Sequence, residues 1–318
     1  MLGKRETPFI REGDNIVFLV GPPRGGTTLM QSFLSREFGF KTIPETHYFN
    51  KIIPKLGRKF SDPEKKIYNK GCSIIKEELY KNSGIIVNKK DLEGLSSREV
   101  FIHLFGGEDS KFFLEKTPLH STSIDLIWKY FPEAKVVQII RDPYSCIASM
   151  SAIRPVNFCD TRISYIHSIR QFSLYWEMGC TPDGKTKNAK NFYRVYYEDF
   201  IENPEKLKSD LARFFCIPNT NIKRENNNFY NLNFNPWQKL NRHSPKKDRK
   251  YAGLNSLKEE EIFLVWFYNK NLIKKMNYPF PAIKIPAWRK TLYLLLDNTK
   301  YLIWKLKIES LIRKLSCS

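Results

Sequence analysis

The sequence predicts an α/β fold in which a parallel β-sheet is flanked by helices. Three short apolar runs, residues 16–20, 135–140 and 192–197, are each followed by a stretch with helical spacing of apolar side chains. Strands that alternate with helices indicate a parallel sheet, because parallel strands need a crossover connection. No linker rich in Pro, Gly or Ser divides the 318 residues. We therefore expect one main domain, residues 1–285, followed by a basic amphipathic helical segment, residues 286–318.

The first apolar run ends in a turn that is typical of an anion-binding loop. The turn and the start of the next helical stretch contain Gly21, Arg24, Gly25, Gly26, Thr27 and Thr28. Unpaired N–H groups converge at the start of a helix, and glycines let an anion approach the main chain. The loop is P-loop-like, but the pattern GxxxxGK[ST] needs a Lys where Gly26 stands, and Arg24 supplies the cation instead. A phosphate or sulfate site is predicted; the alternative is a glycine turn that binds nothing.

The run GPPRGGTTLM resembles the 5'-phosphosulfate loop of the sulfotransferases that use 3'-phosphoadenosine-5'-phosphosulfate (PAPS), whose usual form is GxPRSGTTLL. The resemblance implies the sulfotransferase fold and a 5'-phosphate site formed by Arg24, Gly25, Gly26, Thr27 and Thr28. Gly25 replaces the usual Ser, so one hydroxyl is missing. We expect backbone amides to bind there in its place.

A second motif follows the apolar run 135–140. Arg141 and Asp142 come directly after that run, Pro143 is placed to open a helix, and Ser149 lies two turns into it. Ligands bind at the carboxyl ends of strands in open α/β sheets. The motif resembles the family's 3'-phosphate motif, in which a Ser follows the Arg by eight residues, and this implies that Arg141 and Ser149 bind the 3'-phosphate. The alternative is a structural Arg, with Asp142 capping the helix.

Lys116 ends the strand-like run FFLEK of residues 112–116. The resemblance places a Lys here beside the transferring sulfuryl group. Together with Arg24, it would neutralise charge on the oxygen that bridges sulfur and the departing phosphate. The alternative is a surface Lys before a Pro.

The acceptor hydroxyl must lose its proton, and Glu45 is the candidate base. It lies 21 residues after Arg24, just beyond Gly39, where the chain should return to the sheet edge near the loop. The tyrosylprotein-type sulfotransferases, which this chain resembles most in motif spacing together with bacterial ones, carry a catalytic Glu followed by Thr at this distance, and Glu45 with Thr46 matches. His47 is the competing base, and an ordinary exposed Glu is the other alternative.

Two further cofactor contacts follow from the resemblance. The segment FYRVYYEDF is similar to a family segment in which the Tyr before the Glu lies against adenine, and that position is Tyr197. An aromatic residue at the end of a strand can equally be part of the core. Residues 236–250 contain six basic residues and one acidic residue, and Lys250 falls where the family has a basic stretch over the 3'-phosphate. A solvated loop is the alternative.

The formal net charge of +20 predicts attraction to anions. The basic residues are spread along the chain without a nucleic-acid-binding motif, so we expect no nucleic acid partner. Residues 288–318 contain seven basic and two acidic residues, with leucines and aromatic rings at helical spacing. This pattern allows peripheral membrane contact or a terminal helix packed on the domain. No apolar run is long enough to span a bilayer.

The six cysteines are scattered, without a CxxC pair or a His at ligand spacing, so neither a metal site nor a disulfide framework is expected. The first residues lack the apolar core of a signal peptide, and we expect a cytoplasmic enzyme. The predicted function is metal-independent sulfuryl transfer from PAPS to an acceptor hydroxyl, in a glycan, glycolipid, peptide or small metabolite. The alternatives are a small-molecule kinase with a variant P-loop, and an inactive protein that binds polyanions or a membrane surface.

Overall fold

The computed structural model describes residues 15–104, 112–152, 168–180, 186, 189–217 and 251–316. The chain forms two compact units that are interleaved in the sequence. The first comprises the described parts of Met1–Gly21, Gly26–Ile140 and Thr181–Lys246, and the second those of Pro22–Gly25, Arg141–Cys180 and Lys247–Ser318.

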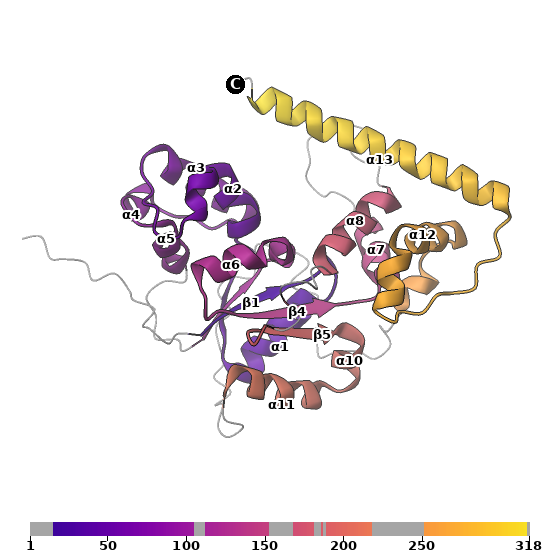
Figure 1. The fold of residues 1–318 in the computed structure, drawn as a ribbon, viewed down its shortest axis with the longest axis horizontal. Helices are drawn as coiled ribbons and strands as arrows, with labels where there is room; N and C mark the ends of the chain where they lie inside the picture. Colours follow the sequence, from indigo (N-terminus) through magenta and orange to yellow (C-terminus); the bar gives the residue numbers. More distant parts are fainter. Residues whose placement is uncertain are drawn as a thin grey trace, which may run out of the picture. The chain divides into compact units, whose positions relative to one another are not determined.

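The first unit is built on a five-stranded sheet in the order β2-β3-β1-β4-β5, and all of its strand pairs are parallel (Figure 1). The strands are β1 (Asn15–Val20), β2 (Lys41–Ile43), β3 (Phe112–Lys116), β4 (Lys135–Ile140) and β5 (Phe192–Tyr196). The predicted α/β class is confirmed, and the three predicted apolar runs are β1, β4 and β5. Tyr197, which was expected to end the last strand, is instead the first residue of a helix, α10 (Tyr197–Glu202).

The sheet is buried on both faces, as expected for parallel strands that carry helices above and below. Successive side chains of β1 alternate between two apolar clusters, so that Phe18 belongs to one and Leu19 to the other, and neither is exposed. Around Phe18, aromatic rings pack edge to face or stacked, including Phe49 and Phe101. The core of this unit is therefore the sheet itself together with the helices on its two faces.

The helices of the first unit divide between these two faces. The face of Leu19 is covered by α1 (Thr27–Phe38), α10 and α11 (Pro204–Phe215). The face of Phe18 is covered by segments that connect β2 to β3 and β3 to β4. These are η1 (Tyr48–Ile52), α2 (Ile53–Leu56), η2 (Arg58–Ser61), α3 (Lys70–Ser83), α4 (Lys89–Leu92), α5 (Ser97–His103), η3 (Pro118–Ser123) and α6 (Ile124–Tyr130).

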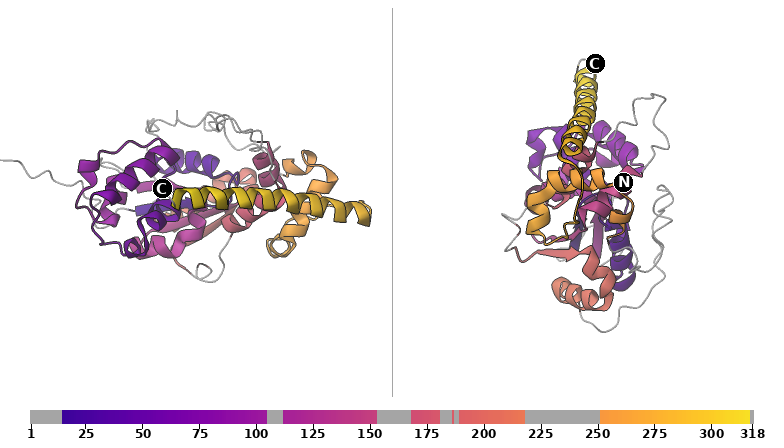
Figure 2. Two further views of the ribbon diagram at one scale, coloured as in Figure 1. Left: turned by 90° about the horizontal axis from the view of Figure 1, so that it is seen from above. Right: turned by 90° about the vertical axis from the view of Figure 1, so that its right-hand side faces the viewer.

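The second unit is helical in its described part. It contains α7 (Pro143–Ser151), α8 (Ile169–Cys180), η7 (Ala252–Asn255), α12 (Glu259–Lys275) and α13 (Ala287–Ser316). Figure 2 shows α13 as one continuous helix whose beginning lies beside α12. Asp297 of α13 accepts hydrogen bonds from the backbone N–H groups of Ile169 at 2.7 Å and Arg170 at 2.9 Å, so it caps the start of α8.

The opposite side of α13 is exposed and apolar. Its exposed large side chains include Trp288, Leu292, Leu295, Leu302 and Leu306. In the part of the chain that the structure describes, no helix is both long and apolar enough to cross a bilayer. The helix thus packs on its own unit by one side and leaves a row of leucines on the other.

Candidate active site

The glycine-rich turn connects β1 to α1, as predicted. Gly26 precedes the first helical residue with φ 95°, a left-handed conformation that favours glycine. No described side chain caps α1, and its first turn contains no acidic residue. The first N–H groups of a helix without a cap are available to an anion, which the helix dipole also favours. This helix start is therefore suited to a phosphate or sulfate group.

Tyr197 lies directly against this turn. A Cβ atom on Gly26 would lie only 2.5 Å from Cδ2 of the Tyr197 ring, and that side chain is 3% exposed. The ring therefore packs on the loop within the first unit. The short distance between the Tyr197 ring and Gly26 explains why position 26 must lack a side chain. The contact of Tyr197 with adenine remains a prediction.

In the second unit, a side chain of the first predicted phosphate motif contacts a side chain of the second. Arg24 donates a hydrogen bond from Nε to Oγ of Ser149 at 2.9 Å. Arg24 has a positive φ of 64°, which is uncommon for a residue with a Cβ atom. The 5'-phosphosulfate-like turn and the helix of the RDP motif, far apart in the sequence, are thus joined by a direct polar contact.

The RDP motif opens α7 in the way its residues suggest. Asp142 accepts a hydrogen bond from the backbone N–H of Ser145 at 2.7 Å and caps the helix, which confirms the capping role considered for it. Burial raises the pKa of this carboxyl. Gly253 also donates its backbone N–H to Oγ of Ser145 at 3.0 Å, so the segment that begins at Tyr251 lies on the first turn of α7. Lys250 itself lies outside the described residues.

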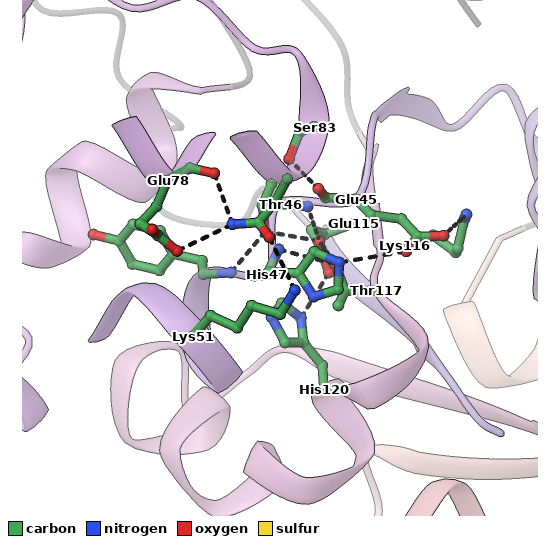
Figure 3. Close-up of polar contacts among 12 residues, drawn as sticks. Glu45, Thr46, His47, Lys51, Glu78, Ser83, Glu115, Lys116, Thr117 and His120 are labelled. Carbon is green, nitrogen blue, oxygen red and sulfur yellow. Dashed lines mark hydrogen bonds and ion pairs between the residues drawn. The ribbon is translucent and has the colours of Figure 1, made fainter. Parts of the chain in front are cut away.

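The predicted base and the predicted catalytic cation form an ion pair in the first unit (Figure 3). Nζ of Lys116 lies 2.5 Å from Oε1 of Glu45. Strands β2 and β3 are neighbours with Ile43 opposite Glu115, so residues that follow Ile43 and Glu115 emerge at the same edge of the sheet. The Lys116 side chain is 2% exposed and that of Glu45 is 28% exposed. The cation is enclosed, whereas the carboxylate keeps contact with solvent.

His47 lies beside this pair, with Nε2 at 3.7 Å from Oε2 of Glu45. Burial, aided by the charge of Lys51, lowers the pKa of His47 to about 4. The imidazole is therefore neutral at neutral pH. Lys51 in turn donates to Oδ1 of Asn82 at 2.9 Å, and burial lowers its pKa. The structure thus brings both candidate bases to one place.

A model of the family described as "Sulfotransferase family" matches residues 16–221, about two thirds of the chain. The chain belongs to the sulfotransferase family. Protein-tyrosine sulfotransferase 1 of Danio rerio is 26% identical over 224 residues, which cover 67% of this chain and 56% of that protein. Protein-tyrosine sulfotransferase A of Caenorhabditis elegans is 24% identical over 217 residues, which cover 67% of this chain and 51% of that protein. The chain spans about half the length of these relatives.

The fold of this family member agrees with a solved structure. The sulfotransferase domain from the Synechococcus PCC 7002 olefin synthase matches with a TM-score of 0.54 and 17% identity, covering 88% of this chain and all of that domain. The sulfotransferase fold expected from the GPPRGGTTLM run is therefore confirmed.

The sequence did not identify the groups that hold the segment around Glu45 in this family member. Oγ of Ser83 donates to the backbone oxygen of Glu45, and Glu115 lies fully buried behind it, within hydrogen-bonding distance of Thr46. The signal for Glu115 was present, because it is a single carboxylate between the apolar residues of β3 and Lys116. A charged residue in such a strand indicates a buried partner. Among the described residues, no group of three His, Cys, Asp or Glu side chains is arranged to hold a metal ion.

Proposed function

We propose that this protein transfers a sulfuryl group from PAPS to an acceptor hydroxyl. The contact between Glu45 and Lys116 is the observation that supports this most directly, since a base and a buried cation meet at the end of β3. Membership of the sulfotransferase family supports the same chemistry. Burying an ammonium group is costly, and an ion pair on the surface contributes little to stability. The enclosure of Lys116 is therefore better explained by a role in function than by stability alone.

In this proposal Glu45 takes the proton of the acceptor hydroxyl as the acceptor oxygen bonds to sulfur. Lys116 and Arg24 neutralise the charge that develops on the phosphate oxygen as its bond to sulfur breaks. The donor supplies an activated sulfuryl group.

The residues at the start of α1 fit an anionic donor. The uncapped first turn supports a 5'-phosphate site at Arg24, Gly25, Gly26, Thr27 and Thr28. We further propose that Arg141 and Ser149 bind the 3'-phosphate, with Tyr197 and Lys250 as additional contacts. The hydrogen bond from Arg24 to Ser149 supports a role for both motifs in one ligand, because each side chain is predicted to contact a phosphate.

The reaction is tested with labelled PAPS and the variants Glu45→Gln and His47→Gln. We expect Glu45→Gln to lower turnover by about 100-fold with little change in binding of 3',5'-bisphosphoadenosine. His47→Gln should retain more than a tenth of the rate. Glu260→Gln, which changes a buried carboxylate in the second unit, is the matched control. Full activity of Glu45→Gln would reject the base assignment, and loss confined to His47→Gln would transfer the role to His47.

A thermal-shift comparison separates the proposal from a kinase. Stabilisation by 3',5'-bisphosphoadenosine without Mg²⁺ is the expected result, because Arg24 and backbone amides replace the P-loop Lys. A response confined to Mg²⁺–ATP would favour the kinase. Binding of the bisphosphate without turnover on any acceptor would favour an inactive binding protein.

For the acceptor, we propose a tyrosine hydroxyl of a protein or peptide. The relatives named protein-tyrosine sulfotransferase support this choice. Peptides with a single Tyr, assayed beside Tyr→Phe versions of the same peptides, should take up label only when the hydroxyl is present. Labelling of a carbohydrate or lipid-linked hydroxyl, with none of the peptides, would contradict it.

We propose that the exposed face of α13 contacts an anionic membrane surface. Its exposed apolar residues recur at the helical spacings of three, four and seven, and Leu295 and Leu302 are 62% and 53% exposed. Exposed Lys300 and Lys305 complement anionic headgroups on the two sides of this row. The full chain should float with vesicles that contain phosphatidylserine, and Leu295→Ser/Leu302→Ser should not. Unchanged flotation of that variant, or self-association of the wild type through α13, would reject the membrane role.

We also propose a cytoplasmic location. The described cysteines Cys72, Cys146, Cys180 and Cys216 are free thiols, which persist in reducing compartments. Fractionation of cells that express the tagged full chain tests this, and recovery in the secretory pathway would contradict it.

A further inference from the structure

Glu115 is a fully buried carboxylate at the end of β3, and only hydrogen-bond donors surround it in its described contacts (Figure 3). Its Oε1 accepts from the backbone N–H of Thr46 at 3.2 Å and from the Thr46 hydroxyl at 2.8 Å. The same oxygen accepts from the Thr117 hydroxyl at 2.6 Å, and Oε2 lies 2.9 Å from Nδ1 of His120. Burying a carboxylate is costly unless its oxygens accept hydrogen bonds, as those of Glu115 do.

These partners connect Glu115 to the turn that follows Glu45. Four consecutive backbone N–H groups are connected to Glu115 by hydrogen bonds, either directly or through one intervening side chain. They belong to Thr46, His47, Tyr48 and Phe49. The first donates to Glu115 itself. The second donates to Oγ1 of Thr117 at 3.3 Å, the third to Oγ1 of Thr46 at 3.2 Å, and the fourth to Nε2 of His120 at 3.1 Å. Every intermediate side chain is itself bonded to Glu115.

The direction of each hydrogen bond in this network is determined. A backbone N–H can only donate, so Nε2 of His120 must accept from Phe49, and Nδ1 must then carry the hydrogen that faces Glu115. Burial raises the pKa of Glu115, but the hydrogen bonds that it accepts from His120, Thr117 and Thr46 lower it, and the lowering is the larger effect. The group is therefore a carboxylate at neutral pH, and it accepts all four of its described hydrogen bonds.

We propose that Glu115 is a positioning residue that fixes the turn carrying Glu45, so that the base is held at Lys116 and the acceptor. Lys116 follows Glu115 in the same strand, so the end of β3 contacts Glu45 directly and anchors the next residue, Thr46, from behind. His47, with φ 52°, lies in a conformation that a free turn would leave readily. This inference rests on the proposed sulfuryl transfer.

The variant Glu115→Gln tests the proposal because it keeps the shape and converts one acceptor into an NH₂ donor. That NH₂ donor would face the N–H of His120 or the threonine hydroxyls, which are donors themselves. The hydrogen bonds that these groups now make to Glu115 would then be lost. We expect kcat to fall by about 10- to 100-fold, with an unchanged KM for PAPS and unchanged affinity for 3',5'-bisphosphoadenosine. Glu260→Gln is the control for loss of a buried carboxylate.

A double-mutant cycle distinguishes positioning from general destabilisation. If Glu115 acts through Glu45, Glu115→Gln should lower the residual rate of the Glu45→Ala protein by less than about twofold, because the base is already absent. Equal losses of kcat in both backgrounds, or an unchanged rate in the single variant, would overturn the proposal. A wild type without sulfuryl transfer, or a fully active Glu45→Ala, would instead contradict the proposed function.

Amide hydrogen exchange tests the positioning without any reliance on activity. Glu115→Gln should speed exchange in residues 46–49 by about 10-fold or more, while Glu260→Gln leaves it unchanged. Should Glu115→Gln fail to fold, Thr117→Val removes only the hydroxyl between His47 and Glu115 and should speed exchange at His47. Unchanged exchange in the variant that folds would overturn the proposal.

Discussion

The ion pair between Glu45 and Lys116 predicts an unequal effect on stability when either partner is neutralised. The variants Glu45→Gln and Lys116→Met each remove one charge and keep nearly the same side-chain volume. Lys116 is 2% exposed and Glu45 is 28% exposed. Loss of Glu45 therefore leaves an enclosed ammonium group without its counter-charge, whereas loss of Lys116 leaves a carboxylate that water can reach.

The magnitudes follow from this difference in exposure. Removing one partner of a buried ion pair costs about 3–5 kcal/mol. The partial exposure of Glu45 and the amide oxygen that remains in Gln reduce the cost for Glu45→Gln to about 2 kcal/mol. For Lys116→Met the apolar stem is kept and the carboxylate is hydrated, so about 0–1 kcal/mol is expected. In a chain of this size, a loss of 2 kcal/mol corresponds to a decrease in Tm of about 3 °C.

Urea unfolding of the wild type, both single variants and the double variant measures these costs. The double variant should resemble Lys116→Met, because Glu45→Gln has no isolated cation to leave behind once Lys116 is gone. Both single variants should also lose activity, so the difference between them lies in stability alone. If Lys116→Met is the more destabilised of the two, the view that Lys116 is an enclosed cation held by Glu45 is wrong.

Four further predictions concern other parts of the chain. Arg141→Ala should weaken binding of 3',5'-bisphosphoadenosine by about 10- to 100-fold in calorimetry, through loss of a charge-assisted contact; unchanged affinity would contradict the 3'-phosphate role. Gly25→Ser, although it restores the usual loop residue, should lower stability to urea by about 1–3 kcal/mol, because a Cβ there lies 2.8 Å from the carbonyl oxygen of Pro22. Asp297→Ala should cost about 2–3 kcal/mol and speed proteolysis within α13, since two N–H groups of α8 lose their acceptor. His47 has a pKa of about 4 in the folded protein against 6.5 in the unfolded chain. The unfolded chain therefore binds the proton more tightly, so the free energy of unfolding falls by about 3 kcal/mol as the pH is lowered from 6.5 to 4. His47→Phe should flatten the pH dependence of urea unfolding in that range.

The features that the sequence predicted are those that depend on a few consecutive residues. The apolar runs of β1 and β4 and the glycine turn that follows β1 each occupy a few consecutive residues, and the turn chemistry of Gly26 is visible without knowledge of its neighbours. The helix end at Gly39, with φ 70°, is of the same kind. Local signals of this type predict strands, helix ends and a glycine turn, but they do not show which distant side chains meet.

The remaining features depend on contacts between residues far apart in the chain. The cap that Asp297 supplies to α8 joins positions 128 residues apart, and no local pattern marks Asp297 as anything but a polar interruption of an apolar helix. The Arg24–Ser149 contact is similar, because each motif predicts a phosphate and neither predicts the other's side chain. Tyr197 was assigned to a strand because aromatic residues favour strands, yet it begins α10, where its ring packs on Gly26.

The short length of β2 explains why the turn that carries Glu45 needs support from a buried network. This edge strand has only three residues and pairs with β3 from Lys41 to Ile43, so it gives little restraint to the chain that follows. Glu45 lies two residues beyond the last strand pair, at a position that the ladder does not reach. The hydrogen bonds from Thr46 to Glu115 supply that missing restraint, because they bind the residue after Glu45 to the same strand that carries Lys116. The adjacent anion and cation at the end of β3 thus serve different purposes: the buried Glu115 fixes the backbone of the turn, and Lys116 pairs with the side chain that the turn presents.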